Sequence, residues 1–181
     1  MAMDLAKLVA EALIVIWPAY VANATPVVAS KLIKRRTPID MGRLFPDGRR
    51  IFGDGKTIEG FAFGVAAGTA LGGLTIYIIS SFIGNALRYP TYLDCLSLSF
   101  WALVGDLIGA FLKRRMGLPR GAPAPLLDQL DFLVAALLVT RLLDPAIVSL
   151  QVFVAAVLLT PPIHLATNAA AYVLGLKKEP W

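Results

Sequence analysis

Three aspartates lie in or beside apolar stretches, where a carboxylate needs a chemical reason to be. Asp106 lies inside an apolar run, and Asp128 and Asp131 open the next one at spacing i, i+3, which puts them on one helical face. An ionised carboxylate inside a membrane is costly unless it faces a wet cavity or a cation. Mg²⁺ takes oxygen ligands and commonly shares them with substrate phosphates. We therefore predict that these three aspartates bind Mg²⁺.

Structural roles for the same carboxylates are also open. Lys113 follows Asp106 at i+7 on the same helical face, so the two could form an ion pair within the bundle. A single aspartate at the start of a helix, such as Asp128, can be an N-cap. Gln129 lies between the paired aspartates and adds an amide to this region.

Two further polar pairs lie in apolar surroundings. Asn23 and Thr25 precede Pro26, which removes one intrahelical hydrogen bond and can free a carbonyl. His164 and Asn168 are one helical turn apart. A lone histidine is usually a hydrogen-bonded core residue, but this pair could also line the same cavity as the aspartates.

The segment Gly53-Asp54-Gly55-Lys56-Thr57 invites comparison with a phosphate-binding P-loop, G-x-x-x-x-G-K-[ST]. Arg50 stands where that motif needs its first glycine and no strand precedes the segment, so it is not a Walker A motif. Backbone amides at a helix start can still hold an anion, and Lys56 adds a positive charge. With Lys113, Arg114 and Arg115, these groups suit a metal–polyphosphate complex that meets a phosphate carried by a lipid.

The composition predicts the environment of these residues. The chain has 181 residues, of which 57% are hydrophobic and 16% charged, against about 45–50% and 25% in soluble domains. Segments 60–87 and 146–176 carry no charge, and each exceeds the roughly 20 residues that cross a bilayer. The single cysteine, Cys95, excludes a disulfide scaffold and a cysteine-based metal site. The net charge is +5, and in a membrane protein the positions of the basic residues along the chain matter more than their sum. We expect no nucleic-acid partner.

We predict an all-α integral membrane protein, because lipid cannot satisfy free backbone groups. It would form one transmembrane catalytic domain over residues 1–181, with five helices at about 8–30, 58–83, 93–112, 126–143 and 146–176. Pro161 and Pro162 predict a kink or break in the last helix. Glycines repeat every fourth residue at Gly60, Gly64, Gly68 and Gly72. This pattern favours close helix packing, either within the bundle or in a homodimer.

The positions of the basic residues predict how the protein is oriented in the membrane. Every lysine and arginine except Lys7, Arg88 and Arg141 lies in segments 31–57 or 113–125 or in the C-terminal tail, Lys177-Lys178. The positive-inside bias puts both long connections and the C-terminus in the cytoplasm, with the N-terminus outside. The site would then face the cytoplasm from the cell membrane. Some of these charges also suit anionic lipid headgroups.

The run from Gly105 to Arg115, Gly-Asp-Leu-Ile-Gly-Ala-Phe-Leu-Lys-Arg-Arg, followed by Asp128-Gln129-Leu130-Asp131, resembles the signature of integral-membrane CDP-diacylglycerol synthases. Asn23-Ala24-Thr25-Pro26, the Gly53–Thr57 segment and His164 with Asn168 point more narrowly to the archaeal branch, the CDP-archaeol synthases. The resemblance covers nearly the whole chain. One departure is Ala110, where many relatives would have a serine.

The resemblance implies Mg²⁺-dependent transfer of CMP from CTP to an isoprenoid ether-lipid phosphate, 2,3-bis-O-geranylgeranylglycerol 1-phosphate, with release of pyrophosphate. In that interpretation Asp106, Asp128 and Asp131 hold Mg²⁺. Four basic residues neutralise the triphosphate and the leaving pyrophosphate, and Lys113 among them is placed in the catalytic group: Lys56, Lys113, Arg114 and Arg115. The remaining candidates bind substrate: Asn23, Thr25, Gly53, Asp54, Thr57, Gln129, His164 and Asn168.

Other classes of membrane protein fit less well. A small transporter or channel would also use intramembrane carboxylates beside helix breaks, but the charged groups gather on one side and no repeated halves are visible. A CDP-alcohol phosphotransferase would need an Asp-Gly-x2-Ala-Arg…Gly…Asp…Asp pattern, which is absent. A purely structural membrane protein would not need three aspartates in costly positions.

Overall fold

The computed structural model describes residues 4–176 and is all-helical over that range, with no strand in it. Its helices are α1 (Leu5–Leu32), α2 (Ile58–Ile83), the short 3₁₀ helix η1 (Gly84–Ala86), α3 (Tyr92–Arg115), α4 (Leu127–Leu143) and α5 (Leu150–Val173). The predicted helices are thus all present, with shifted ends. The third continues to Arg115, so Lys113 and Arg114 belong to a helix and the connection begins at Met116.

Four of the described helices, α1, α2, α3 and α5, are long and apolar enough to cross a membrane. The fifth, α4, has 17 residues, which span about 26 Å at ~1.5 Å per residue. This is slightly less than the roughly 30 Å of a hydrocarbon core. An integral membrane protein therefore fits the structure, and a fifth crossing by α4 stays a prediction.

Polar side chains define where the helices begin. Thr57 accepts a hydrogen bond from Gly60 N at the start of α2, and Ser149 accepts one from Val152 N at the start of α5. Thr91 and Asp94 form a complete capping box at the start of α3. At the other end of α2, Gly84 adopts a φ of 65°, which ends the helix without steric cost.

The expected break in the last helix is absent, because α5 continues through Pro161 and Pro162 without interruption. It is also shorter than predicted, beginning at Leu150 rather than Ala146. Thr160, just before the prolines, accepts a hydrogen bond from Tyr20 of α1 at 2.8 Å. This contact joins the two helices at the point where α5 passes the prolines.

The glycine repeat of α2 packs against α1 of the same chain. A Cβ on Gly64 would lie 2.8 Å from Ala22 O, and one on Gly72 would lie 3.0 Å from Pro18. Ala22 O is the carbonyl that Pro26, without an N–H, leaves free in α1. Of the two predicted uses of the repeat, packing within the bundle is the one observed, so this surface gives no argument for a homodimer.

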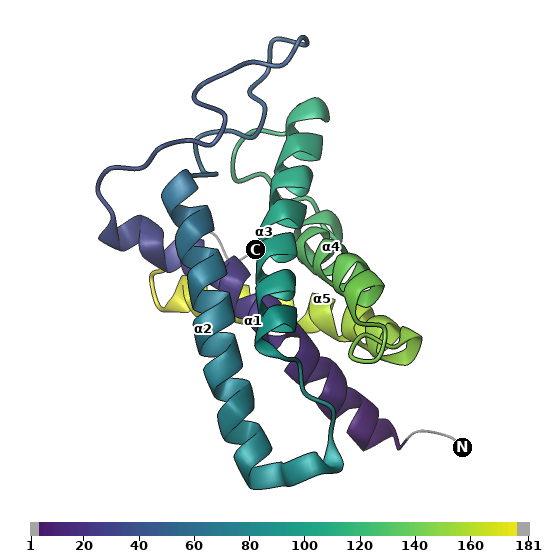
Figure 1. Cartoon of the computed structure of the whole chain (residues 1–181). Coiled ribbons are helices and arrows are strands. Elements are labelled where there is room, and N and C mark those ends of the chain that lie inside the picture. The colour runs from purple at the N-terminus through teal and green to yellow at the C-terminus, as the bar shows by residue number, and fades with distance from the viewer. Residues whose placement is uncertain (1–3, 177–181) are drawn as a thin grey trace.

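The apolar core lies among α1, α3, α4 and α5. Its side chains come from these four helices and are buried almost completely: Ile16, Leu98, Phe132, Leu137 and Val152 are typical. In Figure 1, α2 and α3 run side by side in front, and α1 crosses behind them. Apolar side chains such as Phe82, Leu142 and Leu158 remain exposed, as expected for surfaces that face lipid.

The connections between the helices lie at two opposite ends of the bundle. Arg49, in the α1–α2 connection, donates to the carbonyls of Arg114 and Arg115 at the end of α3. At the opposite end, Arg88 after α2 donates to Ala146 O after α4. The two long connections therefore share one end, which lies at the top of Figure 1. We call it the polar end. Its cytoplasmic orientation stays a prediction, and the basic tail at 177–178 lies outside the described residues.

Candidate active site

The carboxylate of Asp106 forms an ion pair with a lysine from the α1–α2 connection. Lys56 Nζ lies 2.6 Å and 2.5 Å from the two oxygens of Asp106, and both side chains are about one quarter exposed (27%). The alternative pairing with Lys113 is not the one observed. Lys56 reaches α3 because Ile39 N donates to Lys56 O and the next residue, Thr57, is the N-cap of α2.

Lys113 pairs instead with the start of α4. Its Nζ lies 2.5 Å from Asp128 Oδ1, and the other oxygen of Asp128 accepts from Ala124 N at 2.7 Å. Asp128 is therefore not the N-cap that its position allowed, because Leu126 holds that place in α4 without a side-chain hydrogen bond. It instead pairs with Lys113 and binds the backbone just before the helix. The i+7 relation of Asp106 and Lys113 is still informative, because both side chains bind protein rather than face lipid. Asp106 binds Lys56 of the α1–α2 connection, and Lys113 binds Asp128 of α4.

Asp131 lies directly against two glycines of α3. A Cβ on Gly109 would lie only 1.8 Å from Asp131 Oδ2, and one on Gly105 would lie 2.3 Å from Asp131 O. Sequence reasoning missed this role, although Gly105 and Gly109 repeat at the four-residue spacing that was recognised in α2. The missing side chains are what allow Asp131 to lie against the face of α3 that carries Gly105 and Gly109.

The three aspartates do not gather into one metal-binding group. Within residues 4–176, no three His, Cys, Asp or Glu side chains come close enough to hold a metal ion by themselves. Asp106 and Asp131 together offer carboxylate oxygens that suit Mg²⁺, which commonly binds one or two carboxylates and completes its shell with phosphate and water. The donor set fits Mg²⁺ in that form, with the substrate supplying further oxygens.

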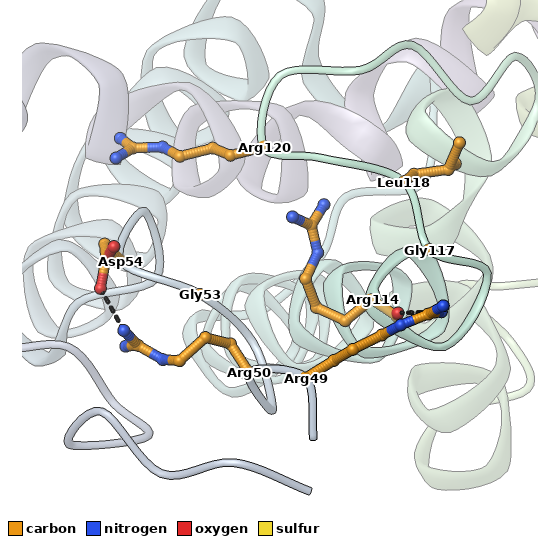
Figure 2. Close-up of a pocket in the computed structure, with 8 residues that line it drawn as sticks. All are labelled: Arg49, Arg50, Gly53, Asp54, Arg114, Gly117, Leu118 and Arg120. Carbon is orange, nitrogen blue, oxygen red and sulfur yellow. Dashed lines mark hydrogen bonds and ion pairs between the residues drawn. The ribbon is translucent and has the colours of Figure 1, made fainter. Parts of the chain in front are cut away.

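An arginine-lined cavity opens at the polar end. It has a volume of about 350 Å³, and Figure 2 shows its lining residues from the α1–α2 connection, the end of α3 and the α3–α4 connection: Arg49, Arg50, Gly53, Asp54, Arg114, Gly117, Leu118 and Arg120. Four guanidinium groups and one carboxylate make its charge strongly positive. Polyphosphates are well matched by such a site, because arginine binds phosphate oxygens with two parallel hydrogen bonds.

The four arginines are held differently. Arg49 caps the end of α3, with Nη1 2.8 Å from Arg115 O, whereas Arg50 is bound by Asp40 and Asp54. The guanidinium of Arg114 extends into the space between these groups (Figure 2), and its only polar contact within residues 4–176 is a long hydrogen bond from Nη2 to Pro119 O at 3.3 Å. Within the described part of the chain, Arg120 has no hydrogen bond or ion pair. Arg114 and Arg120 are therefore the arginines most available to a ligand.

Arg115 has a structural position outside the cavity. Its guanidinium pairs with Asp47 at 2.8 Å, donates to Arg50 O at 2.6 Å and lies over the rings of Phe45 and Phe111. These contacts attach the α1–α2 connection to the end of α3. The three cavity arginines that sequence reasoning did not select, Arg49, Arg50 and Arg120, lay among charges attributed to orientation, and no local motif distinguished them.

The Gly53–Thr57 segment connects the arginine cavity to the Lys56–Asp106 pair. Gly53 and Asp54 line the arginine cavity, while Gly55 and Lys56 line a second, smaller one of about 40 Å³ that also contains Asp106. A Cβ on Gly55 would lie 3.4 Å from Arg120 Nε. Thr57, expected to bind substrate, uses its hydroxyl as the N-cap of α2.

The remaining predicted residues lie farther along the helices. Thr25 Oγ1 donates to Val21 O in its own helix at 2.7 Å, and Asn23 is half-buried on α1. His164 and Asn168 lie within hydrogen-bond distance of each other at 3.0 Å on α5, and the His164 ring faces Phe132. Gln129 is buried in the first turn of α4. None of these five lines either of the two cavities described above.

The chain is similar to proteins of known name over almost its whole length. The family model described as CarS-like, CDP-archaeol synthase, matches residues 5–181. A CDP-archaeol synthase of Pyrobaculum calidifontis is 54% identical over 96% of this chain and 98% of its own length. One of Aeropyrum pernix is 47% identical over 94% of this chain and 91% of its own.

A solved structure is similar in fold as well as in sequence. It is described as an intramembrane enzyme for the biosynthesis of archaeal membrane lipids. The TM-score is 0.71 and the identity 45%, over 88% of this chain and 94% of the other. At 45% identity the two proteins share much of their sequence as well as the arrangement of their helices.

Proposed function

Because this chain belongs to the CarS-like family of CDP-archaeol synthases, we propose that it transfers CMP from CTP to 2,3-bis-O-geranylgeranylglycerol 1-phosphate and releases pyrophosphate. The family is one of membrane cytidylyltransferases, so an enzyme is favoured over a transporter or channel. The observation that carries the proposal is the arginine-lined cavity, joined through Gly55 to the Lys56–Asp106 pair.

The cavity suits the triphosphate of CTP. Its volume of about 350 Å³ lies at the lower end of the ~300–1,000 Å³ typical of small-molecule sites. Arg114 and Arg120 would bind phosphate oxygens, while Arg50 and Arg49 add positive charge at the rim. Positive charge here would stabilise the pyrophosphate as it departs, when its negative charge increases.

The reaction needs charge neutralisation more than a general base. A phosphomonoester with a second pKa near 6 is mostly dianionic at pH 7, so its oxygen can attack the α-phosphorus of CTP directly. That oxygen–phosphorus bond forms while the bond from the α-phosphorus to the bridging oxygen breaks. Lys56, between the cavity and Asp106, would reduce the repulsion between the two anions and help hold them in line.

Mg²⁺ is an expected cofactor, and Asp106 and Asp131 are the residues that would hold it. When bound, it would neutralise and orient the phosphate oxygens. Asp128, whose oxygens bind Lys113 and Ala124 N, would keep the start of α4 in place and thereby position Asp131 one turn later. The isoprenoid tails would lie along the apolar helix surfaces, so the lipid would reach the polar end from the membrane.

The direct test is an assay with purified protein, labelled CTP, Mg²⁺ and the unsaturated ether-lipid phosphate, scored for a labelled CDP-lipid. We expect product from the wild type and none after chelation of Mg²⁺. Asp106→Asn should lower kcat by a factor on the order of 10²–10³, the usual size for loss of one group that stabilises the transition state. Asp144→Asn, at the opposite end of the bundle, is the matched control and should retain activity.

Folded wild-type protein that makes no CDP-lipid would contradict the proposed function. Folded Asp106→Asn protein with full activity would contradict the assignment of Asp106 alone. Melting temperatures in the same detergent distinguish loss of chemistry from loss of structure in both cases.

A further inference from the structure

The most completely bound carboxylate at the polar end is that of Asp40, which neither its sequence context nor the proposed reaction singles out. Its side chain is fully buried (0% exposed) in the α1–α2 connection. Arg50 donates to it through Nε at 3.2 Å and through Nη2 at 2.5 Å. Three backbone amides donate as well: Gly42 at 3.1 Å, Phe52 at 3.0 Å and Gly53 at 2.9 Å.

The backbone around Asp40 is folded tightly to make these contacts. Met41 and Gly42 both have positive φ values, 48° and 80°. The left-handed conformation is uncommon for a residue with a side chain such as methionine and persists where the surrounding structure enforces it. The contacts of Asp40 with the 50–53 segment therefore determine the shape of the connection.

The partners of Asp40 are themselves parts of the arginine cavity. Both Arg50 and Gly53 line that cavity, and Arg50 Nη1 also binds Asp54 there at 2.6 Å. The contacts to Asp40 and Asp54 use three of the five donors that a guanidinium offers. Within residues 4–176, the other donors of Arg50 have no recorded partner, which leaves them for an anion in the cavity.

The same carboxylate lies next to the segment that delivers Lys56. Ile39 N, one residue before Asp40, donates to Lys56 O at 2.8 Å, and Pro38 pairs with Thr57 across an isolated β-bridge. Gly53 N, bound by Asp40, precedes Lys56 by three residues. The buried carboxylate of Asp40 thus connects the arginine cavity with the Lys56–Asp106 pair.

We propose that Asp40 is a positioning residue, which holds the Arg50 guanidinium and the 52–56 backbone in the arrangement that binds a polyphosphate. This rests on the proposed function only in taking the ligand of the cavity to be a polyphosphate. Asp40 touches no substrate in this role. It acts through Arg50 and the turn at Gly53.

Binding of inorganic pyrophosphate to the purified full chain, measured by titration calorimetry, tests the proposal without requiring turnover. We expect Asp40→Asn to weaken binding about tenfold, because the neutral amide cannot hold the guanidinium as a carboxylate does. Asp47→Asn is the matched control: it removes another carboxylate of the same connection, whose arginine partner, Arg115, lies outside the cavity. It should bind pyrophosphate within about twofold of the wild type.

A double-mutant cycle separates positioning from general loss of structure. In an Arg50→Met background Asp40 has no cavity arginine to hold, so Asp40→Asn should then change pyrophosphate affinity by less than about twofold. A merely structural role would give the same loss in both backgrounds and would overturn the proposal. In the steady-state assay, Asp40→Asn should raise the KM for CTP and leave the KM for the lipid phosphate unchanged.

If Asp40→Asn does not fold, Arg50→Lys keeps the charge but removes the paired contact, and unchanged pyrophosphate affinity in that variant would overturn the proposal. Absence of pyrophosphate binding by the wild type would overturn it too. Wild-type protein that makes no CDP-lipid, while the binding differences appear as expected, would instead contradict the proposed function and leave the role of Asp40 in place.

Discussion

At the scale of single residues, the polar end is organised by carboxylates that each bind a cation distant in the sequence. Asp106 binds Lys56, Asp128 binds Lys113, and Asp40 binds Arg50. Removing one member of such a partly buried pair leaves the other charge uncompensated, which is more costly than losing an exposed pair. These side chains therefore contribute to both the fold and the chemistry, and only matched variants can separate the two contributions.

Arg120 offers a variant in which stability should not change. The part of the chain that the structure describes gives it no hydrogen bond or ion pair, so Arg120→Gln removes no polar contact there. Hydrogen bonds to charged groups contribute ~1.5–3 kcal/mol, so we expect the KM for CTP to rise about tenfold or more. The effect should shrink as salt is added, because screening weakens the wild-type interaction.

Arg36→Gln is the control for this variant. Arg36 is an exposed arginine of the α1–α2 connection and lines neither cavity. Its KM for CTP should equal that of the wild type. Equal KM values for Arg120→Gln and Arg36→Gln would show that Arg120 does not contact the nucleotide.

Asp40 also predicts a pH dependence of stability. Burial alone would raise its pKa, but the hydrogen bonds from Arg50 and from the amides of Gly53, Phe52 and Gly42 hold the pKa of this carboxyl well below its usual range. A lowered pKa in the folded state stabilises the fold above the unfolded pKa, about 3.9. That contribution is lost as the pH falls from there through the folded pKa.

The measurement is the melting temperature of the wild type minus that of Asp40→Asn across a pH series in detergent. We expect this difference to stay constant from about pH 7 to pH 5 and to decrease below about pH 4. A difference that stays constant down to about pH 2 would mean that the pKa of this carboxyl is the same in the folded and unfolded states, contrary to the contacts observed.

At the scale of elements, two pairs of helices approach closely because glycine replaces a side chain. In the α1–α2 pair the glycines of α2 lie against Pro18 and Ala22. In the α3–α4 pair, Gly105 and Gly109 lie against the backbone and side chain of Asp131. The first contact is structural, whereas the second places a carboxylate of the candidate site.

Gly109→Ala tests the second contact. The new Cβ would lie 1.8 Å from Asp131 Oδ2, so either the carboxylate or helix α4 must move. Overpacking of this kind costs about 1–3 kcal/mol. We expect a lower melting temperature together with a large loss of kcat, measured in the CDP-lipid assay.

Ile108→Ala is the neighbouring control, because Ile108 is half exposed on the outer surface of α3. It should retain most of its activity. Gly109→Ala protein with wild-type activity and melting temperature would show that Asp131 tolerates displacement, and would remove it from the candidate site.

At the scale of the whole molecule, the fold has one end with long, basic connections and one end with short ones. Contacts between segments remote in sequence establish this: Lys31, in the last turn of α1, donates to Gly175 O after α5, and Arg88 donates to Ala146 O at the other end. All described cavities and their arginines belong to the first end. The positive-inside bias predicts that this end faces the cytoplasm.

Single cysteines test that orientation and the crossing by α4. In a Cys95→Ala background, Lys34→Cys and Ala146→Cys place exposed thiols at opposite ends of the bundle. We expect an impermeant maleimide to label Ala146→Cys in spheroplasts and Lys34→Cys in inverted vesicles. Labelling of both thiols from the same side would contradict the predicted number of crossings, and the reversed pattern would contradict the orientation.

The sequence alone determined the class of the molecule and the chemistry of its polar residues. Uncharged runs longer than a bilayer dictate helices, since lipid leaves no other way to satisfy the backbone, and glycine spacing indicated close packing. Asp106 and Lys56 were selected because charge beside apolar sequence is costly and therefore informative. Such properties are local, so one sequence is enough to predict them.

Only the tertiary structure decided which charges meet. Lys113 is seven residues from Asp106 yet binds Asp128, and Lys56 reaches Asp106 from fifty residues away in the sequence. Arg120 joins the cavity, whereas Arg115, in the predicted motif, attaches a connection to α3. Long flexible side chains in the connections have many partners within reach, and their choice depends on how the helices pack. That packing is a property of the whole chain, which no local pattern records.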